Sequence, residues 1–480
     1  MLTCAALVVG CAEIIHNDPI NQPLADNAPP IEAVSDSDVR ATYDDFEVGL
    51  AFSGGGMRAA AFSYGVLTGL GKTQISTTDH AISLLDHIDF VSGVSGGSII
   101  AAYYGLKRRD ALSDFRERFL LANPEEDLQT NLNFFNIARG LDVGINDSMQ
   151  FAHWLDAHLF DNATFKELLT RRRPVVWINA SDIYNRTDFP FTPVTFSALC
   201  SDLRNYPISL AVAASAAVPV VFAPVVVQNY LGGCPTPLPK WIDSVRHDQN
   251  AAPMMKSYAD ALERYRTGEI KYVKLLDGGL VDNYGLAPIT ITRLANKTPY
   301  GPLEPQEAVK LRRFLFLVVD AGRAPSGGWV RSVAGPSGID LITAASDTAT
   351  ESAALSSYSS FQDTMNIWRQ KLIDWRCQLS EADRRRYHAP PGWSCKDVKF
   401  FIGRIAFEDL GPDRAGGLNR IKTTLRLPPD QVDMLIAAGH DALKSSPVFR
   451  AFLQSLPSVQ RSPVVPIASP MAGSKQARGN

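Results

Sequence analysis

The serine in Gly93-Val94-Ser95-Gly96-Gly97 is the residue whose surroundings are most typical of a nucleophile. A short β-branched run ends at Ser92, and a run of small residues that favours a helix begins after Gly96. Gly-x-Ser-x-Gly between a strand and a helix holds a serine on a strained turn with its hydroxyl exposed. Glycine on both sides relieves the crowding of so tight a turn. The alternative is a glycine-rich turn that only packs a helix on a sheet.

A second glycine turn, Gly54-Gly55-Gly56, lies between the predicted strand 46–53 and an apolar helix. Its spacing Gly54-x-Gly56-x-x-Ala59 matches a dinucleotide-binding fingerprint, but no strand ending in Asp or Glu follows at the required distance. The other interpretation is an anion-binding nest, in which consecutive backbone N–H groups at a helix N-terminus face one negative atom. Beside a nucleophilic serine such a nest acts as an oxyanion hole, and we favour this interpretation.

A carboxylate is predicted at the end of a third strand, where the run 272–276 leads into Asp277-Gly278-Gly279. Three glycine turns therefore each follow an apolar strand, and in a parallel sheet they converge on one edge. The first turn has an anion nest, the second an exposed serine and the third a carboxylate. These groups suffice for acyl transfer if the carboxylate accepts the serine proton directly.

Histidine offers an alternative base, because in Gly-x-Ser-x-Gly hydrolases a histidine follows the acid along the chain. Only His388 and His440 lie beyond Asp277. His388 lies in a proline-rich stretch beside a run of arginines, and His440 lies on a predicted helix, so neither follows a strand. A Ser-Asp-His esterase, with His440 as the better candidate, is the alternative to a dyad of Ser95 and Asp277.

Composition places the chain among ordinary globular proteins. Its 480 residues are 45% hydrophobic, which is enough for a large α/β domain with insertions. The net charge of −3 argues against nucleic-acid binding. The arginine runs 171–173 and 384–386 are interpreted as solvated surface. Pro219 and Pro224 interrupt the uncharged stretch 208–227, which favours a buried helix and a strand over a membrane span.

The N-terminal residues 1–11 are typical of a lipoprotein signal. Leu7-Val8-Val9-Gly10-Cys11 has the form of a lipobox, in which a cysteine follows apolar and small residues. The stretch before it is apolar, although it is short and lacks a basic start. We expect Cys11 to be lipidated and the protein to be anchored to a membrane of the cell envelope. The alternative is an unprocessed, disordered start.

The rest of the chain divides into a tether, one domain and a tail. Residues 12–44 are rich in Pro, Asn and Asp without periodicity, which predicts a flexible tether. Residues 45–456 form the predicted catalytic domain, with a helical insertion near 110–172 and a C-terminal helical extension. Residues 457–480 are rich in Pro and Ser and are predicted to be disordered.

Four cysteines lie beyond the N-terminal segment. Proximity in the sequence favours the pairs Cys200–Cys234 and Cys377–Cys395, although four cysteines allow three pairings. Disulfides are typical of exported proteins, and reduced thiols in a cytosolic protein are the alternative. None of the cysteines lies in a Cys-x-x-Cys arrangement, so no zinc site is expected.

The chain resembles the patatin-like phospholipase family in four motifs, which occur in the family's order over residues 46 to about 320. The motifs are Ser53-Gly54-Gly55-Gly56-Met57-Arg58, Gly93-Val94-Ser95-Gly96-Gly97, Ala214-Ser215-Ala216-Ala217-Val218-Pro219, and Asp277-Gly278-Gly279 with Asp282-Asn283-Tyr284-Gly285. The later segment Leu425-Arg426-Leu427-Pro428-Pro429-Asp430-Gln431-Val432 resembles a bacterial branch of the family, less specifically.

This resemblance implies an α/β fold, a three-layer α/β/α sandwich with a mostly parallel central sheet. It implies a lipid acyl hydrolase, similar to a phospholipase A or a lysophospholipase, that cleaves carboxylic esters through a Ser–Asp dyad. By this likeness Ser95 is the nucleophile and Asp277 the base, and the glycines at 54–56 form the oxyanion hole together with Arg58, which matches the family's motif arginine. No metal or other cofactor is expected. The expected partners are a lipid or acyl-ester substrate and a membrane surface.

Two other classes of function stay open. A flavin- or nicotinamide-binding protein would use the stretch 54–59 and would carry a bound, light-absorbing cofactor. A non-catalytic lipid-binding envelope protein would not be labelled by a serine-directed phosphonate. The insertion near 110–172 and the cysteine-bearing region beyond 375 depart from the family's pattern and leave substrate choice open.

Overall fold

The computed structural model describes residues 18–25, 45–76, 81–126, 146–170, 173–231, 234, 237–325 and 327–456. The predicted signal with Cys11, most of the predicted tether, the middle of the predicted insertion and the predicted tail lie outside these residues. No helix in the described ranges has the length and apolar content that crossing a membrane requires.

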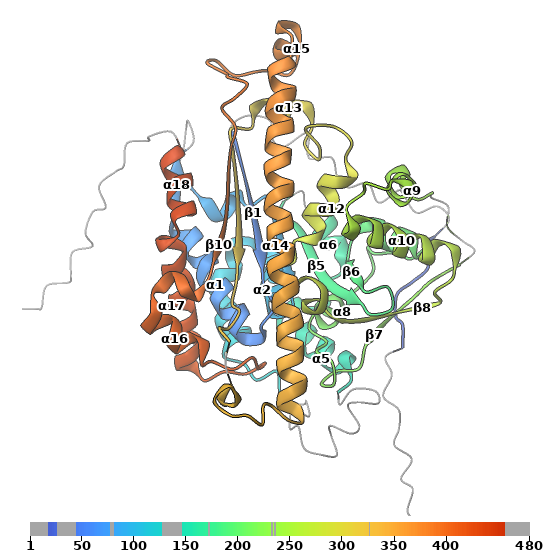
Figure 1. Ribbon diagram of the computed structural model, residues 1–480, viewed down its shortest axis with the longest axis vertical. Coiled ribbons are helices and arrows are strands. Elements are labelled where there is room, and N and C mark those ends of the chain that lie inside the picture. Colours follow the sequence, from blue (N-terminus) through green and yellow to red (C-terminus); the bar gives the residue numbers. More distant parts are fainter. Residues whose placement is uncertain are drawn as a thin grey trace, which may run out of the picture.

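One eight-stranded sheet forms the centre of the fold, with helices on both of its faces (Figure 1). Its strands follow the order β10-β9-β1-β4-β5-β8-β7, and β6 pairs with β5. Their bounds are β1 Phe46–Phe52, β4 Phe90–Val94, β5 Val175–Asp182, β6 Thr187–Pro190, β7 Val225–Gln228, β8 Tyr272–Asp277, β9 Arg313–Val319 and β10 Lys399–Ile405. A separate two-stranded sheet consists of β2 Gln74–Ser76 and β3 Ala81–Ser83.

The sheet is parallel from β10 to β5 and antiparallel beyond it. β8 runs against β5, and β7 and β6 also pair in antiparallel fashion with their neighbours. The expectation that the strand leading to Asp277 lies parallel to the other two is therefore wrong. The mostly parallel character of the sheet is confirmed.

Side chains that alternate along the strands enter two separate cores, one on each face of the sheet. On β9, Leu315 lies in the larger core, whereas Phe314 and Phe316 lie in the smaller one. Helices α1 (Gly56–Lys72), α2 (Gly96–Lys107), α8 (Ile208–Ser215) and α17 (Pro429–Ser445) contribute to the larger core, while α13 (Pro305–Lys310) and α14 (Ile339–Gln378) contribute to the smaller one. Figure 1 shows α14 lying along the strands over the length of the molecule. The predicted three-layer α/β/α arrangement is confirmed.

The helices include the predicted apolar helix after the glycine turn and one long continuous helix that begins at Ile339. The described parts of the insertion near 110–172 are mostly helical. The α-helices are α1 Gly56–Lys72, α2 Gly96–Lys107, α3 Ala111–Phe115, α5 Ser148–Leu155, α6 Phe165–Leu169, α7 Pro193–Ala198, α8 Ile208–Ser215, α9 Lys240–His247, α10 Pro253–Thr267, α11 Gly279–Asp282, α12 Ala287–Ala295, α13 Pro305–Lys310, α14 Ile339–Gln378, α15 Glu381–Arg386, α16 Pro412–Asn419, α17 Pro429–Ser445 and α18 Pro447–Ser455.

The C-terminal region of the domain is not only helical, because it also adds a strand to the central sheet. β10 extends the sheet beside β9, a strand that was not predicted because Lys399, Gly403 and Arg404 interrupt its apolar pattern. α17 packs directly on α1 through Gly65 of α1 and Gly439 of α17, each of which lies against the backbone of the other helix. A Cβ atom added at Gly439 would lie 2.0 Å from the Phe62 carbonyl oxygen.

We expect Gly439→Ala to destabilise the fold, because the new methyl group cannot fit against the α1 backbone. Overpacking of this kind costs about 3 kcal/mol in the free energy of unfolding, which outweighs the helix propensity of alanine. Gly416→Ala on α16 is the matched control, since the nearest atom to its added Cβ lies 4.0 Å away. Urea titration should show opposite shifts of the unfolding midpoint for the two variants. Equal shifts would contradict the packing argument.

Both favoured disulfides are present in the structure. Cys200 is bonded to Cys234 and Cys377 to Cys395, with Cα–Cα distances of 5.0 and 4.9 Å. These bonds connect segments outside the regular sheet, one beside β7 and the other between the end of α14 and the start of β10.

Part of the predicted tether is docked on the domain. The Asn21 side chain donates hydrogen bonds to Ser201 Oγ at 2.9 Å and to the Gln228 carbonyl at 2.8 Å. The Leu24 N–H donates to the Cys200 carbonyl at 2.8 Å. The expectation of a flexible tether is therefore corrected for residues 18–25, which lie against the edge strand β7 and the first disulfide.

Candidate active site

Ser95 lies on a sharp elbow between β4 and α2. Its backbone has φ 51° and ψ −124°, a sparsely populated conformation for a residue with a side chain. The residues after Ser95 must be glycines because other backbone segments lie too close for a side chain. A Cβ at Gly96 would lie 2.0 Å from the Gly56 carbonyl oxygen, and one at Gly97 would lie 2.4 Å from the Phe52 carbonyl oxygen. The glycines therefore allow the Ser95 turn to approach the Gly54–Gly56 loop, as the motif predicts.

Asp277 reaches the same position from the opposite direction. β5 is longer than β4, so that Asn179 pairs with Val94 and the next residue, Ala180, pairs with Asp277. Because β8 runs antiparallel to β5, its last residue comes back to the level at which β4 ends. The convergence of Ser95 and Asp277 is found, although it arises from an antiparallel strand.

Burial, one hydrogen bond and the nearby Ser95 side chain set the charge of Asp277. Asp277 is 9% exposed, and burial raises the pKa of its carboxyl group to about 6. The Gly279 N–H, which donates to Asp277 Oδ1 at 2.8 Å, and the Ser95 side chain oppose this rise because they stabilise the ionised form. A carboxylate with this pKa is ionised at neutral pH and is a stronger base than an exposed aspartate.

The glycine loop 54–56 lies at the start of α1, facing the Ser95 elbow. Gly55 and Gly56 have φ angles of 138° and 60°, which favour glycine. The Gly54 N–H already donates to the Asn283 carbonyl at 3.1 Å. Within the described part of the chain, the N–H groups of Gly55 and Gly56 have no backbone or side-chain acceptor, so these two amides are available to a bound anion.

Arg58 fixes the loop from behind. Its guanidinium is buried and donates from Nε to the Ala321 carbonyl at 2.8 Å and from Nη1 to the Ile421 carbonyl at 3.0 Å. Burial lowers its pKa to about 10, and the neighbouring Arg323 acts in the same direction. The motif arginine therefore connects α1 to the segment after β9 and to the segment between α16 and α17. Through these hydrogen bonds Arg58 holds the glycine loop in place.

Two motif residues without a predicted role support the nucleophile and the loop. Ser215 Oγ accepts the Ser95 N–H at 2.9 Å and donates to the Asn179 carbonyl at 2.6 Å. Asn283 fills the space between the loop and the acid: a Cβ added at Gly54 would lie 2.4 Å from its Oδ1. The motifs contained both residues, but only their spatial neighbours reveal what they do.

The segment carrying Asn283 is fixed on both sides. Asp282 accepts the Ala287 N–H at 2.7 Å and the Ser357 hydroxyl at 3.2 Å. Tyr284 Oη donates to Asp320 Oδ2 at 2.8 Å, at the end of β9. Asn283 therefore lies between two anchored neighbours, with little freedom to leave the site.

Neither histidine lies near this site. His440 packs against Gly69, whose added Cβ would lie 3.4 Å from His440 Cδ2. Gly69 lies about 20 Å along α1 from Gly56, at 1.5 Å per residue. His388 follows α15, which comes directly after α14. The end of α14 lies where β9 starts, because Arg376 donates to the carbonyl of Leu311 just before β9, whereas Ser95 lies at the end of the sheet where the parallel strands finish. Nor do the described residues contain a cluster of His, Cys, Asp or Glu that could hold a metal ion.

The fold and the site place the chain among α/β/α proteins that pair an elbow serine with a buried carboxylate. A family model described as patatin-like phospholipase matches residues 50–290, and the chain belongs to this family. Membership of this family supports the function of a lipid acyl hydrolase. Assignment to a bacterial branch stays a prediction.

Comparison with individual proteins adds little to the family assignment. No curated protein matches the chain. Human GIVD cytosolic phospholipase A2 is 14% identical, with a TM-score of 0.41, over 85% of this chain and 62% of that one. The same human enzyme in complex with methyl γ-linolenyl fluorophosphonate is 14% identical, with a TM-score of 0.38, over 85% and 59% of the chains. The chain thus spans about three-fifths of these structures.

Proposed function

We propose that the protein hydrolyses carboxylic esters of lipids, as a phospholipase A or lysophospholipase, through a dyad of Ser95 and Asp277. The observation that carries the proposal is that the Ser95 side chain lies beside a buried carboxylate and stabilises its charge, while burial raises the pKa of that carboxylate to about 6. A base with a pKa near the working pH combines ionisation with basicity. The distant histidines favour this dyad over a Ser-Asp-His site.

In the first half of the reaction, Ser95 Oγ attacks the ester carbonyl carbon while its proton passes to Asp277. The oxyanion that forms accepts hydrogen bonds from the N–H groups of Gly55 and Gly56, at the positive end of the α1 dipole. The carbon–oxygen bond of the ester then breaks, and the leaving alcohol takes the proton from Asp277. An acyl group remains on Ser95.

In the second half, water attacks the acyl group and gives a proton to Asp277. The tetrahedral oxyanion is bound by the same two amides. When it collapses, the bond to Ser95 Oγ breaks, the proton returns to Ser95, and the fatty acid leaves. Asp277 is thus a base and an acid in turn, without a histidine between it and the serine.

Two measurements test the function itself. Purified protein should hydrolyse members of a panel of acyl esters, phospholipids and lysophospholipids, and a fluorophosphonate should label Ser95. A protein that binds lipid without turnover would remain unlabelled and inactive, and a bound flavin or nicotinamide would appear in the absorption spectrum. Either result would reject the proposed hydrolase.

Ester hydrolysis should depend on pH through Asp277. Because burial raises its pKa to about 6, the carboxyl group is protonated at lower pH and cannot accept the serine proton. We expect kcat/KM to fall about tenfold for each pH unit below 6 and to level off above 7. The profile should be measured with a soluble short-chain ester whose own hydrolysis is subtracted. A profile that continues to rise steeply above pH 7 would point to another base.

We further propose that the protein acts in the cell envelope, anchored through Cys11. The lipobox at 7–11 and the two disulfides support this proposal, since disulfides persist in oxidising compartments. Residues 18–25, which begin seven residues after Cys11, are docked on the domain. A lipid on Cys11 would therefore lie within about 25 Å of the domain surface, at about 3.5 Å per extended residue.

A further inference from the structure

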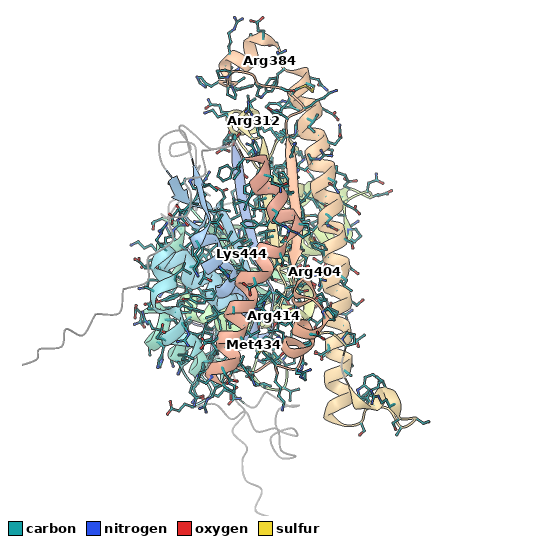
Figure 2. The ribbon with its side chains drawn as sticks, turned by 90° about the vertical axis from the view of Figure 1, so that its left-hand side faces the viewer. Arg312, Arg384, Arg404, Arg414, Met434 and Lys444 are labelled. Carbon is teal, nitrogen blue, oxygen red and sulfur yellow. A yellow bond between two sulfur atoms is a disulfide. The ribbon has the colours of Figure 1, made fainter. Side chains whose placement is uncertain are left out.

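The chain leaves the sheet after β9 at the edge that carries Ser95. The Ala321 N–H donates to Ser53 Oγ at 2.9 Å, and the Ala321 carbonyl accepts from Arg58 at 2.8 Å. Beyond this point the chain passes through a 3₁₀ turn at Gly328–Arg331 and returns as α14. Figure 2 shows the lower end of α14 and the segment before it standing clear of the rest of the described chain.

The start of α14 projects well beyond the catalytic edge. The Ser357 hydroxyl on α14 donates a hydrogen bond to Asp282 at 3.2 Å, and Asp282 lies five residues after Asp277 in the sequence. Ile339, where α14 begins, therefore lies about 27 Å from the level of Ser357 along the helix axis, at 1.5 Å per residue. We call residues 327–341 the projecting tip.

Large apolar side chains gather on the projecting tip. Trp329, Val330, Val333 and Leu341 are 38%, 68%, 108% and 53% exposed. Arg331 is exposed among them, and the sequence has two arginines and no acidic residue between Asp320 and Asp340. Exposed apolar side chains that gather in this way mark a surface that another phase or molecule covers.

We propose that the projecting tip inserts into the interfacial region of a lipid bilayer and so turns the edge with Ser95 and Asp277 toward the membrane. This inference rests on the proposed lipid hydrolysis, because it names the surface from which the substrate is taken. Tryptophan prefers the headgroup region, valine and leucine the acyl boundary, and arginine the phosphates.

The shape and charge of the tip favour a bilayer over a second protein. A protein partner must offer a cavity that fits a convex apolar projection, whereas a bilayer accepts such a projection without a matching shape. The acid-free segment also suits phosphate groups. Since Arg331 and Asp340 are the only charged residues in the sequence of the tip and their charges are opposite, apolar burial should dominate, and the tip should bind zwitterionic vesicles as well as anionic ones.

Vesicle sedimentation tests the proposal directly. All proteins carry Ser95→Ala, so that turnover does not change the lipid, and Cys11→Ser, so that no lipid anchor is present. The tip variant adds Val330→Ser and Val333→Ser. The matched control instead adds Ile367→Ser on the far half of α14 and Met434→Ser on α17, which are 56% and 45% exposed. The probes are phosphatidylcholine vesicles with and without phosphatidylglycerol.

We expect the tip variant to bind both vesicle types at least tenfold more weakly than the parent and the control. In the catalytically intact background, the same substitutions should slow hydrolysis of vesicle lipid but not of a soluble short-chain ester. Equal vesicle binding by the tip variant and parent would overturn the proposal. So would a shift from dimer to monomer in the tip variant without a change in vesicle binding, because the tip would then bind a second copy. Loss of the proposed function is a separate result, since binding is measured without catalysis.

Discussion

Ser95→Ala is expected to lower ester hydrolysis at least about a thousandfold while leaving the fold intact. The hydroxyl is the attacking group, and without it no acyl group can form on the protein. The Ser95 N–H, which donates to Ser215 Oγ at 2.9 Å, is retained in the variant. Alanine must still adopt the positive φ of the elbow, a strain that serine already bears.

Ser98→Ala is a suitable comparison for this prediction. Ser98 lies on the next turn of α2, is fully buried, and donates through Oγ to the Ser95 carbonyl at 2.7 Å. Its loss removes a hydrogen bond near the site but no reacting atom. Hydrolysis of a short-chain ester should therefore change little in Ser98→Ala and vanish in Ser95→Ala, at equal folded concentration by circular dichroism. Near-normal turnover by Ser95→Ala would remove the serine from the mechanism.

The positions of Ser95 and Asp277 could be predicted because their signals are local. Each residue ends a short strand and is followed by glycines, so sequence alone places it at a strand end. The direction of β8 could not be predicted in this way. It depends on pairing with β5 and β7, which lie far away in sequence and offer no short-range signal. β5 extends past β4, and this extension brings the two reacting groups together.

The roles of individual residues in and beside the loop 54–56 could not be predicted from the sequence either. The Gly54 N–H is taken by the carbonyl of Asn283, and Arg58 is held by a carbonyl 363 residues later in the chain. A motif shows which residue types are present, but hydrogen-bond competition decides which donors stay available. Because of this competition, the oxyanion hole predicted from three glycines and an arginine becomes a proposed oxyanion hole of two backbone amides, those of Gly55 and Gly56.

Asp277→Asn is expected to lower hydrolysis nearly as far as Ser95→Ala. Asparagine keeps the shape of the side chain and can still accept the Gly279 N–H, but it cannot take the serine proton. The double variant Ser95→Ala with Asp277→Asn should be little worse than either single variant, because the two groups act as one unit. His388→Ala and His440→Ala should each keep most of the activity. A histidine variant as inactive as Ser95→Ala, with its fold intact, would replace the dyad with a triad.

Stability separates a catalytic Asp277 from one that only ties down its turn. Burial raises its pKa from 3.8 in the unfolded chain to about 6, so the folded state binds the proton more tightly. The stability due to the protonated form is complete below pH 3.8 and is lost as pH rises toward 6. Asparagine stays uncharged, so Asp277→Asn should be more stable than the parent at pH 8, by about 3 kcal/mol at most. The difference should shrink to about 0.5 kcal/mol at pH 4. A purely structural Asp277 predicts the reverse, an active variant that unfolds more easily at pH 8, and urea titrations at the two pH values distinguish the cases.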